Sequence, residues 1–292
     1  MNLLGTGLSG LVGVRLIELL SPRYTFTNLS LEEGIDITDI KSVEQIFAAN
    51  DAPWVLHLAA ITDVDAAEKD RSRGKDGLVW KVNVDATANI VRMCRKYHKR
   101  LLYVSTDYVF DGRKSVYDES DKPNPQGWYG VTKYEGELLV NEMGSDGLVI
   151  RIANPYRHAW RGKPDFVHKI MARLAERQPV VSPDDQIFVP THIDDIANTI
   201  SYLVTAKVSG IYHVVGSEAL SPYKAAKLIA SAFGMDVSLV SATTFAEFFA
   251  GRAPRPFHAY LNNAKITNCG ISLKTFNAGL EFIRRKEGGK TV

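Results

Sequence analysis

Short apolar runs alternate with longer amphipathic segments along the first half of the chain. An apolar run of about four to eight residues is typical of a buried strand, and apolar residues three or four apart are typical of a packed helix. The alternation therefore favours βαβ units and a parallel sheet. Strands are expected at Asn2–Gly5, Tyr24–Asn28, Trp54–Leu58, Leu101–Ser105 and Leu148–Ile152, and helices at Gly10–Leu20, Val43–Ala49, Val79–Tyr97 and Gly130–Glu142.

The pattern becomes less regular after Ile152, where a Pro-rich, aromatic stretch follows. We expect a doubly wound α/β domain of the Rossmann type over residues 1–152. Residues 153–292 are expected to form a smaller α/β substrate lobe, partly interleaved with the main sheet. Helices there are predicted near Phe166–Glu176, Ile193–Thr205 and Pro222–Phe233 and from Leu273 onward, and strands at Pro179–Ser182, Gln186–Val189 and Ile211–Val215.

A glycine-rich turn, with glycines at positions 5, 7, 10 and 13, joins the first predicted strand to the first helix. Glycines allow the backbone to approach a pyrophosphate, whose charge then meets the free amides of the helix start. Because the turn lies between a strand and a helix, it predicts a dinucleotide-binding site rather than an ordinary turn.

The end of the second strand bears on which dinucleotide is bound. An acid at this tip would bind the adenosine ribose of NAD and repel the 2′-phosphate of NADP. The strand ends in Asn28-Leu29-Ser30, without an acid, and no Arg or Lys follows immediately. The expected cofactor is therefore NADP(H) or NAD(H), with a slight preference for NADP(H).

A tyrosine and a lysine four residues apart, Tyr129 and Lys133, follow the fourth strand. At this spacing the two side chains share one face of a helix. A neighbouring ammonium favours the phenolate, so we expect it to lower the pKa of Tyr129. Such a phenol can exchange a proton with a substrate oxygen near neutral pH. Thr106, at the end of its strand, could hydrogen-bond the same oxygen.

Composition is that of an ordinary globular protein, with 45% hydrophobic and 23% charged residues. The net charge of +2 gives no sign of a nucleic-acid partner, and no apolar run approaches the roughly 18 residues of a membrane span. Two distant cysteines, Cys94 and Cys269, favour a reducing compartment. The start Met1-Asn2 leads straight into the glycine turn, so we expect a cytoplasmic protein without a signal peptide.

These motifs resemble the extended short-chain dehydrogenase/reductases, and most closely the dTDP-4-dehydrorhamnose reductase family. The resemblance is specific through residues 1–143 and looser afterwards. It is carried by the glycine turn and by the segments Asp36–Asp39, Ala59–Glu68, Asn83–Thr87, Ser105–Gly112 and Tyr129–Glu137. It implies NAD(P)H-dependent reduction of the 4-keto group of a nucleotide-activated deoxysugar, with a homodimer left open.

The resemblance also implies roles for single residues. Tyr129 would protonate the developing alkoxide, and Lys133 would bind the nicotinamide ribose. Thr106 completes this catalytic set. The other implied cofactor contacts are Gly10, Leu11 and Val12 at the pyrophosphate, Asp36 and Ile37 beside the adenine, Ala60 and Thr62 toward the nicotinamide, and also Gly7, Ala59 and Val104. Thr106, Asp107, Asn154 and Arg255 would face the nucleotide-sugar.

Two alternatives remain open on the sequence. The segment Asn154–Tyr156 is more similar to the extended sugar-nucleotide epimerases and dehydratases, which would retain their NAD. The segment Phe188–His192 is similar to the non-catalytic, NADP-binding regulatory subunit of methionine adenosyltransferase. The tryptophans Trp128 and Trp160 could flank a ligand, although packing is the more common role of a single aromatic residue.

Charged residues elsewhere have simpler interpretations. Asp63, Asp65 and Glu68 are expected to favour the positive end of a helix rather than to bind a metal, so no metal site is predicted. Arg252 and Arg255 could hold a diphosphate, because guanidinium groups match phosphate oxygens.

Overall fold

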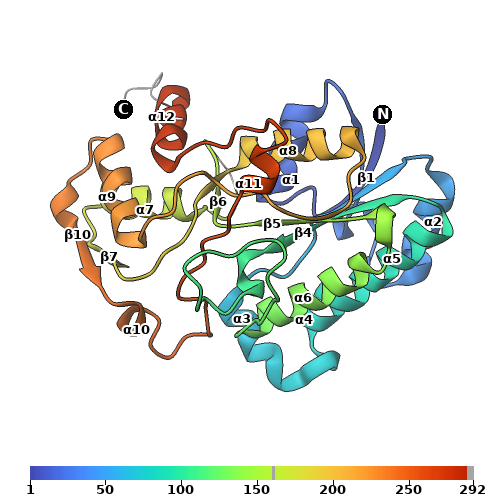
Figure 1. Ribbon diagram of the computed structural model, residues 1–292, viewed down its shortest axis with the longest axis horizontal. Coiled ribbons are helices and arrows are strands. Elements are labelled where there is room, and N and C mark those ends of the chain that lie inside the picture. Colours follow the sequence, from blue (N-terminus) through green and yellow to red (C-terminus); the bar gives the residue numbers. More distant parts are fainter. Residues whose placement is uncertain (160–161, 288–292) are drawn as a thin grey trace.

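A six-stranded parallel sheet forms the centre of the computed structural model, which describes residues 1–159 and 162–287 (Figure 1). The strand order is β2-β1-β3-β4-β5-β9, so the chain reverses direction across the sheet at β1. Ligands of doubly wound folds bind at such a reversal. The strands are β1 (Asn2–Thr6), β2 (Thr25–Leu29), β3 (Trp54–His57), β4 (Arg100–Thr106), β5 (Gly147–Ile152) and β9 (Gly210–His213). The predicted fold class is confirmed.

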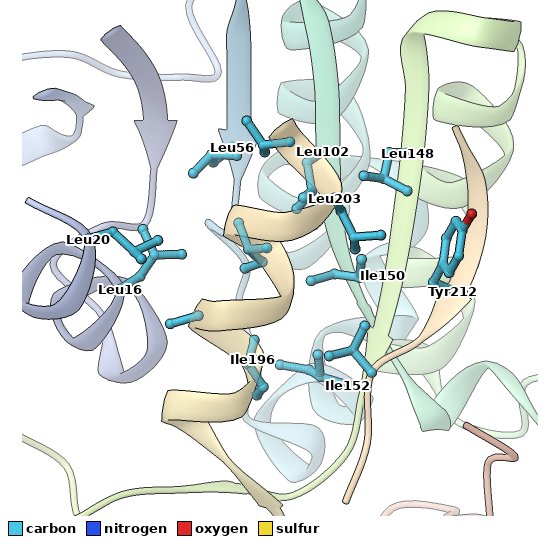
Figure 2. Close-up of a cluster of buried hydrophobic side chains, with 14 of the residues drawn as sticks. Leu16, Leu20, Leu56, Leu102, Leu148, Ile150, Ile152, Ile196, Leu203 and Tyr212 are labelled. Carbon is cyan, nitrogen blue, oxygen red and sulfur yellow. The ribbon is translucent and has the colours of Figure 1, made fainter. Parts of the chain in front are cut away.

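Helices cover both faces of this sheet. Side chains of a strand alternate between faces, so Leu102 of β4 packs with the helices α1 (Leu11–Leu20) and α8 (Ile193–Ala206), as Figure 2 shows. Its neighbour Leu101 packs on the opposite face. That face is covered by α2 (Ile40–Ala49), α5 (Ala86–Lys96) and α6 (Trp128–Asn141).

A smaller lobe stands beside the carboxyl end of the sheet (Figure 1). Its apolar centre includes Tyr156, Phe276 and Leu280. The lobe contains β6 (Pro155–Tyr156), α7 (Phe166–Ala175), β7 (Val180–Pro183), β8 (Thr191–His192), α9 (Pro222–Ala232), η6 (Val237–Leu239), β10 (Val240–Thr243), α10 (Phe245–Phe248) and α12 (Phe276–Glu287). Two elements from beyond residue 152, β9 and α8, belong to the main sheet and its cover. The boundary at residue 152 stays a prediction.

Short elements complete the chain. They are η1 (Leu31–Glu33), α3 (Val64–Asp70), η2 (Arg71–Asp76), α4 (Leu78–Trp80), η3 (Lys81–Asp85), η4 (Asp107–Val109), η5 (Gly144–Asp146) and α11 (Ala264–Thr267). None of the helices in the described part of the chain combines the length and the apolar character that crossing a membrane requires.

Some predicted elements differ from the structure. The strand predicted at Gln186–Val189 is wrong: Ile187 and Phe188 form only isolated bridges, to His258 and Leu220. A ladder cannot form because these two successive residues pair with separate segments. The helix predicted at Val79–Tyr97 is continuous, but its residues 81–85 form a π-helical turn.

Candidate functional site

A cavity of about 730 Å³ opens at the carboxyl edge of the parallel strands. Gly7 follows β1, Ala59 follows β3, Thr106 ends β4 and Asn154 follows β5, and all four line this cavity. In an open α/β sheet this edge is the usual ligand site. We name it the dinucleotide cavity.

The glycine turn forms the floor of the dinucleotide cavity. Gly7 has a φ of 67°, and a Cβ there would lie 2.6 Å from the amide nitrogen of Ala59. A Cβ on Gly13 would lie 2.4 Å from the Cα of Leu8. Gly10 is the N-cap of α1 and provides no capping side chain, so the first amides of the helix remain available. This arrangement suits a pyrophosphate.

Every residue predicted to contact the cofactor lines the dinucleotide cavity. These are Gly7, Gly10, Leu11, Val12, Asp36, Ile37, Ala59, Ala60, Thr62, Val104, Tyr129 and Lys133. Two hydroxyl or carboxyl oxygens at its wall, Ser105 Oγ and Asp107 Oδ2, are buried without a hydrogen-bond partner among the described residues. Buried polar atoms normally have partners, so these fit a bound polar molecule. The residues present therefore fit a dinucleotide.

The proposed catalytic residues come from two elements. Thr106 is the last residue of β4, and Tyr129 and Lys133 lie one turn apart on α6. All three side chains are buried and line the dinucleotide cavity. The Thr106 side chain lies close enough to the Tyr129 phenol to lower its pKa, against the effect of burial. A phenol and a hydroxyl thus line the same cavity.

The expectation that Lys133 lowers the pKa of Tyr129 is wrong in this structure. Burial raises the pKa of Tyr129, and the hydrogen bond with Thr106 opposes this only in part. Lys133 Nζ lies over the ring of Tyr103, 3.9 Å from its centre. Burial lowers the pKa of Lys133 to about 7, against the carboxylate of Glu137, which raises it. Burial disfavours the charged form of both groups. It therefore determines the direction of both pKa shifts, whereas the helical spacing had predicted a lowered pKa for Tyr129.

Asp107 joins this cavity to a second one. Its side chain is buried, and its Oδ1 accepts a hydrogen bond from Thr106 Oγ1 at 2.9 Å. Burial raises the pKa of Asp107 to about 7, although the hydrogen bond from Thr106 lowers it. Asp107, Tyr108 and Asn154 line both cavities. A ligand that reacts beside Tyr129 can therefore extend from one cavity into the other.

The second cavity has a volume of about 190 Å³, and we name it the lobe cavity. Its walls come mainly from the smaller lobe and are rich in aromatic rings. Its aromatic residues are Tyr108, Phe166, Phe188, Phe248 and Phe249. No local pattern in the sequence predicts this cavity, because its rings come from segments far apart in the chain. Phe188 drew attention in the sequence only as the start of the segment that is similar to the regulatory subunit.

Arg255, predicted to contact the substrate, lines neither cavity. Its Nη2 donates a hydrogen bond to Asp65 Oδ1 at 2.8 Å, and Arg252 Nη2 donates to Asp65 Oδ2 at 2.9 Å. Burial opposes ionisation of Asp65, but the hydrogen bonds from Arg252, the Ala253 amide and Arg255 bring its pKa to about 2. The Arg255 guanidinium also lies 4.7 Å from the centre of the Phe249 ring, which lines the lobe cavity.

The neighbouring acids have structural partners as well. Asp63 caps α3 by accepting from the Ala66 amide, and Glu68 accepts from the Trp128 amide at 2.7 Å. The described residues contain no group of three or more metal-ligating side chains. Trp128 stacks on Trp80, whereas Trp160 lies outside the described residues.

Comparisons with known proteins agree with this geometry. A family model described as the RmlD substrate binding domain matches residues 1–286. A solved dTDP-4-dehydrorhamnose reductase from Bacillus anthracis, in complex with NADP, has a TM-score of 0.89 and 30% identity, covering 98% of this chain and 99% of that one.

Two relatives differ in the function that their names state. The dTDP-4-dehydrorhamnose reductase of Mycobacterium tuberculosis is 33% identical over 246 residues, covering 81% of this chain and 77% of that protein. Methionine adenosyltransferase 2 subunit beta of Bos taurus is 28% identical over 256 residues, covering 85% of this chain and 75% of that protein.

Proposed function

This chain belongs to the RmlD substrate binding domain family, and we propose that it reduces the 4-keto group of a nucleotide-activated deoxysugar with NAD(P)H. One observation carries this proposal: Thr106 and Tyr129 line the dinucleotide cavity together with Asp107, which also lines the lobe cavity. One cavity suits the dinucleotide, and the other suits the nucleotide-sugar. The reacting carbonyl would lie between them.

The side chains have complementary roles in this reaction. The reduced nicotinamide supplies the hydride when the cofactor is bound. Because burial raises its pKa, Tyr129 is a neutral phenol at neutral pH and holds the proton that the new alkoxide needs. Thr106 orients the same substrate oxygen. Lys133, one helical turn from Tyr129, would hold the nicotinamide ribose.

The lobe cavity would bind the nucleotide part of the substrate. Aromatic rings such as Phe248 and Phe249 present flat apolar faces, which stack well on a nucleobase. Arg252 and Arg255 lie beside these rings but pair with Asp65. A diphosphate would have to compete with Asp65 for either guanidinium, so a substrate contact of Arg255 stays a prediction.

Replacing Tyr129 by Phe tests the proposal directly. With a dTDP-4-keto-6-deoxysugar, Tyr129→Phe should oxidise NAD(P)H about 10²–10⁴-fold more slowly, while cofactor binding stays intact. Tyr134→Phe is the matched control, because Tyr134 is on the same helix but lines neither cavity. An undiminished rate for Tyr129→Phe would refute the role of this phenol.

A second candidate is an NAD-retaining sugar-nucleotide epimerase or dehydratase. Asn154 favours it, since this residue has a φ of 42° and lines both cavities, in the segment that resembles those enzymes. Such an enzyme regenerates its cofactor, so NAD would copurify with the protein and no net oxidation of NAD(P)H would accompany turnover.

A third candidate is a regulatory subunit, like the bovine relative. The presence of Thr106, Tyr129 and Lys133 in one cavity favours an enzyme, because a scaffold does not need them. A stoichiometric partner from cell extract, together with no turnover of any ketosugar, would instead favour the subunit.

A further inference from the structure

The segment that follows β2 gives the dinucleotide cavity a negatively charged wall. Residues 30–39 contain Glu32, Glu33, Asp36 and Asp39, and no Lys or Arg occurs between Arg23 and Lys41. Glu32 and Asp36 line the cavity, whereas Glu33 does not. Because β2 is at the edge of the sheet farthest from β5, this wall is at the adenosine end.

In the part of the chain that the structure describes, no Lys or Arg lines that end of the cavity. Among the described residues, Lys133 is the only Lys or Arg that lines the cavity, and it lies beside Tyr129 on α6. The 2′-phosphate of NADP carries close to two negative charges at neutral pH. Placed beside Glu32 it would meet a like charge without a partner, which raises the free energy of the bound state.

Ser30, in the same segment, could attract a ligand where the acids repel one, because its hydroxyl has no hydrogen-bond partner among the described residues. It occupies the N-cap position of η1 but makes no capping hydrogen bond there. Its Oγ is buried without a partner among the described residues, and Ser30 lines the same wall of the cavity as Glu32. A buried hydroxyl of this kind is suited to a hydroxyl on the ligand.

We propose that this chain selects NAD(H) over NADP(H) at the ribose 2′ position, with Ser30 hydrogen-bonding the ribose hydroxyl and Glu32 repelling a 2′-phosphate. The proposal rests on the proposed function only through cofactor binding. A related structure holds NADP, so the proposal makes this chain differ from that relative. The slight preference for NADP(H) from the sequence depended on the tip of β2 alone, whereas Glu32 reaches the cavity from the following turn.

Binding measurements on the full chain test this selection without a sugar substrate. NADH and NADPH are titrated by protein fluorescence, and ADP-ribose and 2′-phospho-ADP-ribose are used as probes that lack the nicotinamide. The dissociation constant should be at least about tenfold lower for NADH than for NADPH, with the same order for the two fragments. Equal or tighter binding of NADPH would overturn the proposal.

Two variants assign the effect to residues. Glu32→Gln should tighten NADPH binding several-fold and leave NADH unchanged, whereas Glu33→Gln, with the same change in charge outside the cavity, should alter neither. Ser30→Ala should weaken NADH binding several-fold and NADPH binding less. Equal effects of the two glutamate variants, or unchanged NADH binding by Ser30→Ala, would contradict the assigned roles.

The same samples keep this inference distinct from the proposed reaction. If the chain binds NADH selectively but turns over no ketosugar, the proposed reaction is wrong and the cofactor selection stands. If it reduces a ketosugar equally well with both cofactors and binds both equally, only the selection is wrong.

Discussion

A buried ion pair behind the candidate site allows a quantitative prediction. Glu137 and Arg151 are almost completely buried, with side-chain exposures of 0% and 1%. They form two hydrogen bonds, from Arg151 Nε at 2.9 Å and from Arg151 Nη2 at 2.7 Å. Glu137 is one helical turn beyond Lys133, whose pKa its carboxylate raises. The pair thus connects β5 to α6, the helix that carries Tyr129 and Lys133.

Replacing Glu137 by Gln should leave the guanidinium buried without a counter-charge. The neighbouring His213 supplies no negative charge, because an imidazole is neutral or positive, and burial lowers its pKa to about 3. Breaking a buried pair on one side costs about 3–5 kcal/mol. Whole domains are stable by roughly 5–15 kcal/mol, so the loss is a large share of the total.

Urea unfolding followed by circular dichroism measures this loss. Glu135→Gln is the control, because Glu135 is on the same helix and forms none of the ion pairs of the described residues. The double variant Glu137→Leu with Arg151→Met should recover most of the stability, since an apolar pair removes both charges. A loss below about 1 kcal/mol for Glu137→Gln, or no recovery in the double variant, would refute this account.

Two further predictions concern the glycine turn and the smaller lobe. Gly7→Ala should destabilise the fold by at least about 1 kcal/mol more than Gly34→Ala. Both glycines have a positive φ, but only the new Cβ at position 7 would collide with backbone atoms, those of Ala59. Equal losses of stability in urea unfolding would contradict this prediction. Hydrogen bonds to Asp165 and Glu287 raise the pKa of His168 to about 9. The stabilisation by these contacts should be complete below pH 6.5 and disappear as the pH rises through 9. The difference in unfolding free energy between the wild-type protein and His168→Gln should follow the same course. A difference that does not change with pH would exclude the ion pair.

Much of the fold could be predicted from the chain alone. The strands of the main sheet follow from short apolar runs, and the glycine turn follows from its place between a strand and a helix. Tyr129 and Lys133 share a cavity because helical spacing alone places them on one face. These features depend on residues close together in the sequence. Local periodicity is therefore enough to fix them.

The family resemblance also predicted residues of the cavity that no local pattern in the sequence singles out. Asp36, Ala60 and Val104 line the dinucleotide cavity as it implied. Periodicity alone could not have singled them out, because their environment depends on which strands become neighbours. Their contacts with the cofactor stay predictions.

Other features were decided only when distant segments packed together. The phenol of Tyr129 has a raised pKa because of burial, which the helical spacing does not reveal. Arg255 pairs with Asp65, 190 residues away in the chain. The lobe cavity likewise combines rings from separate segments. Sequence determines local geometry through short-range sterics and periodicity, whereas burial and charge partners depend on the whole fold, so only the tertiary structure determined them.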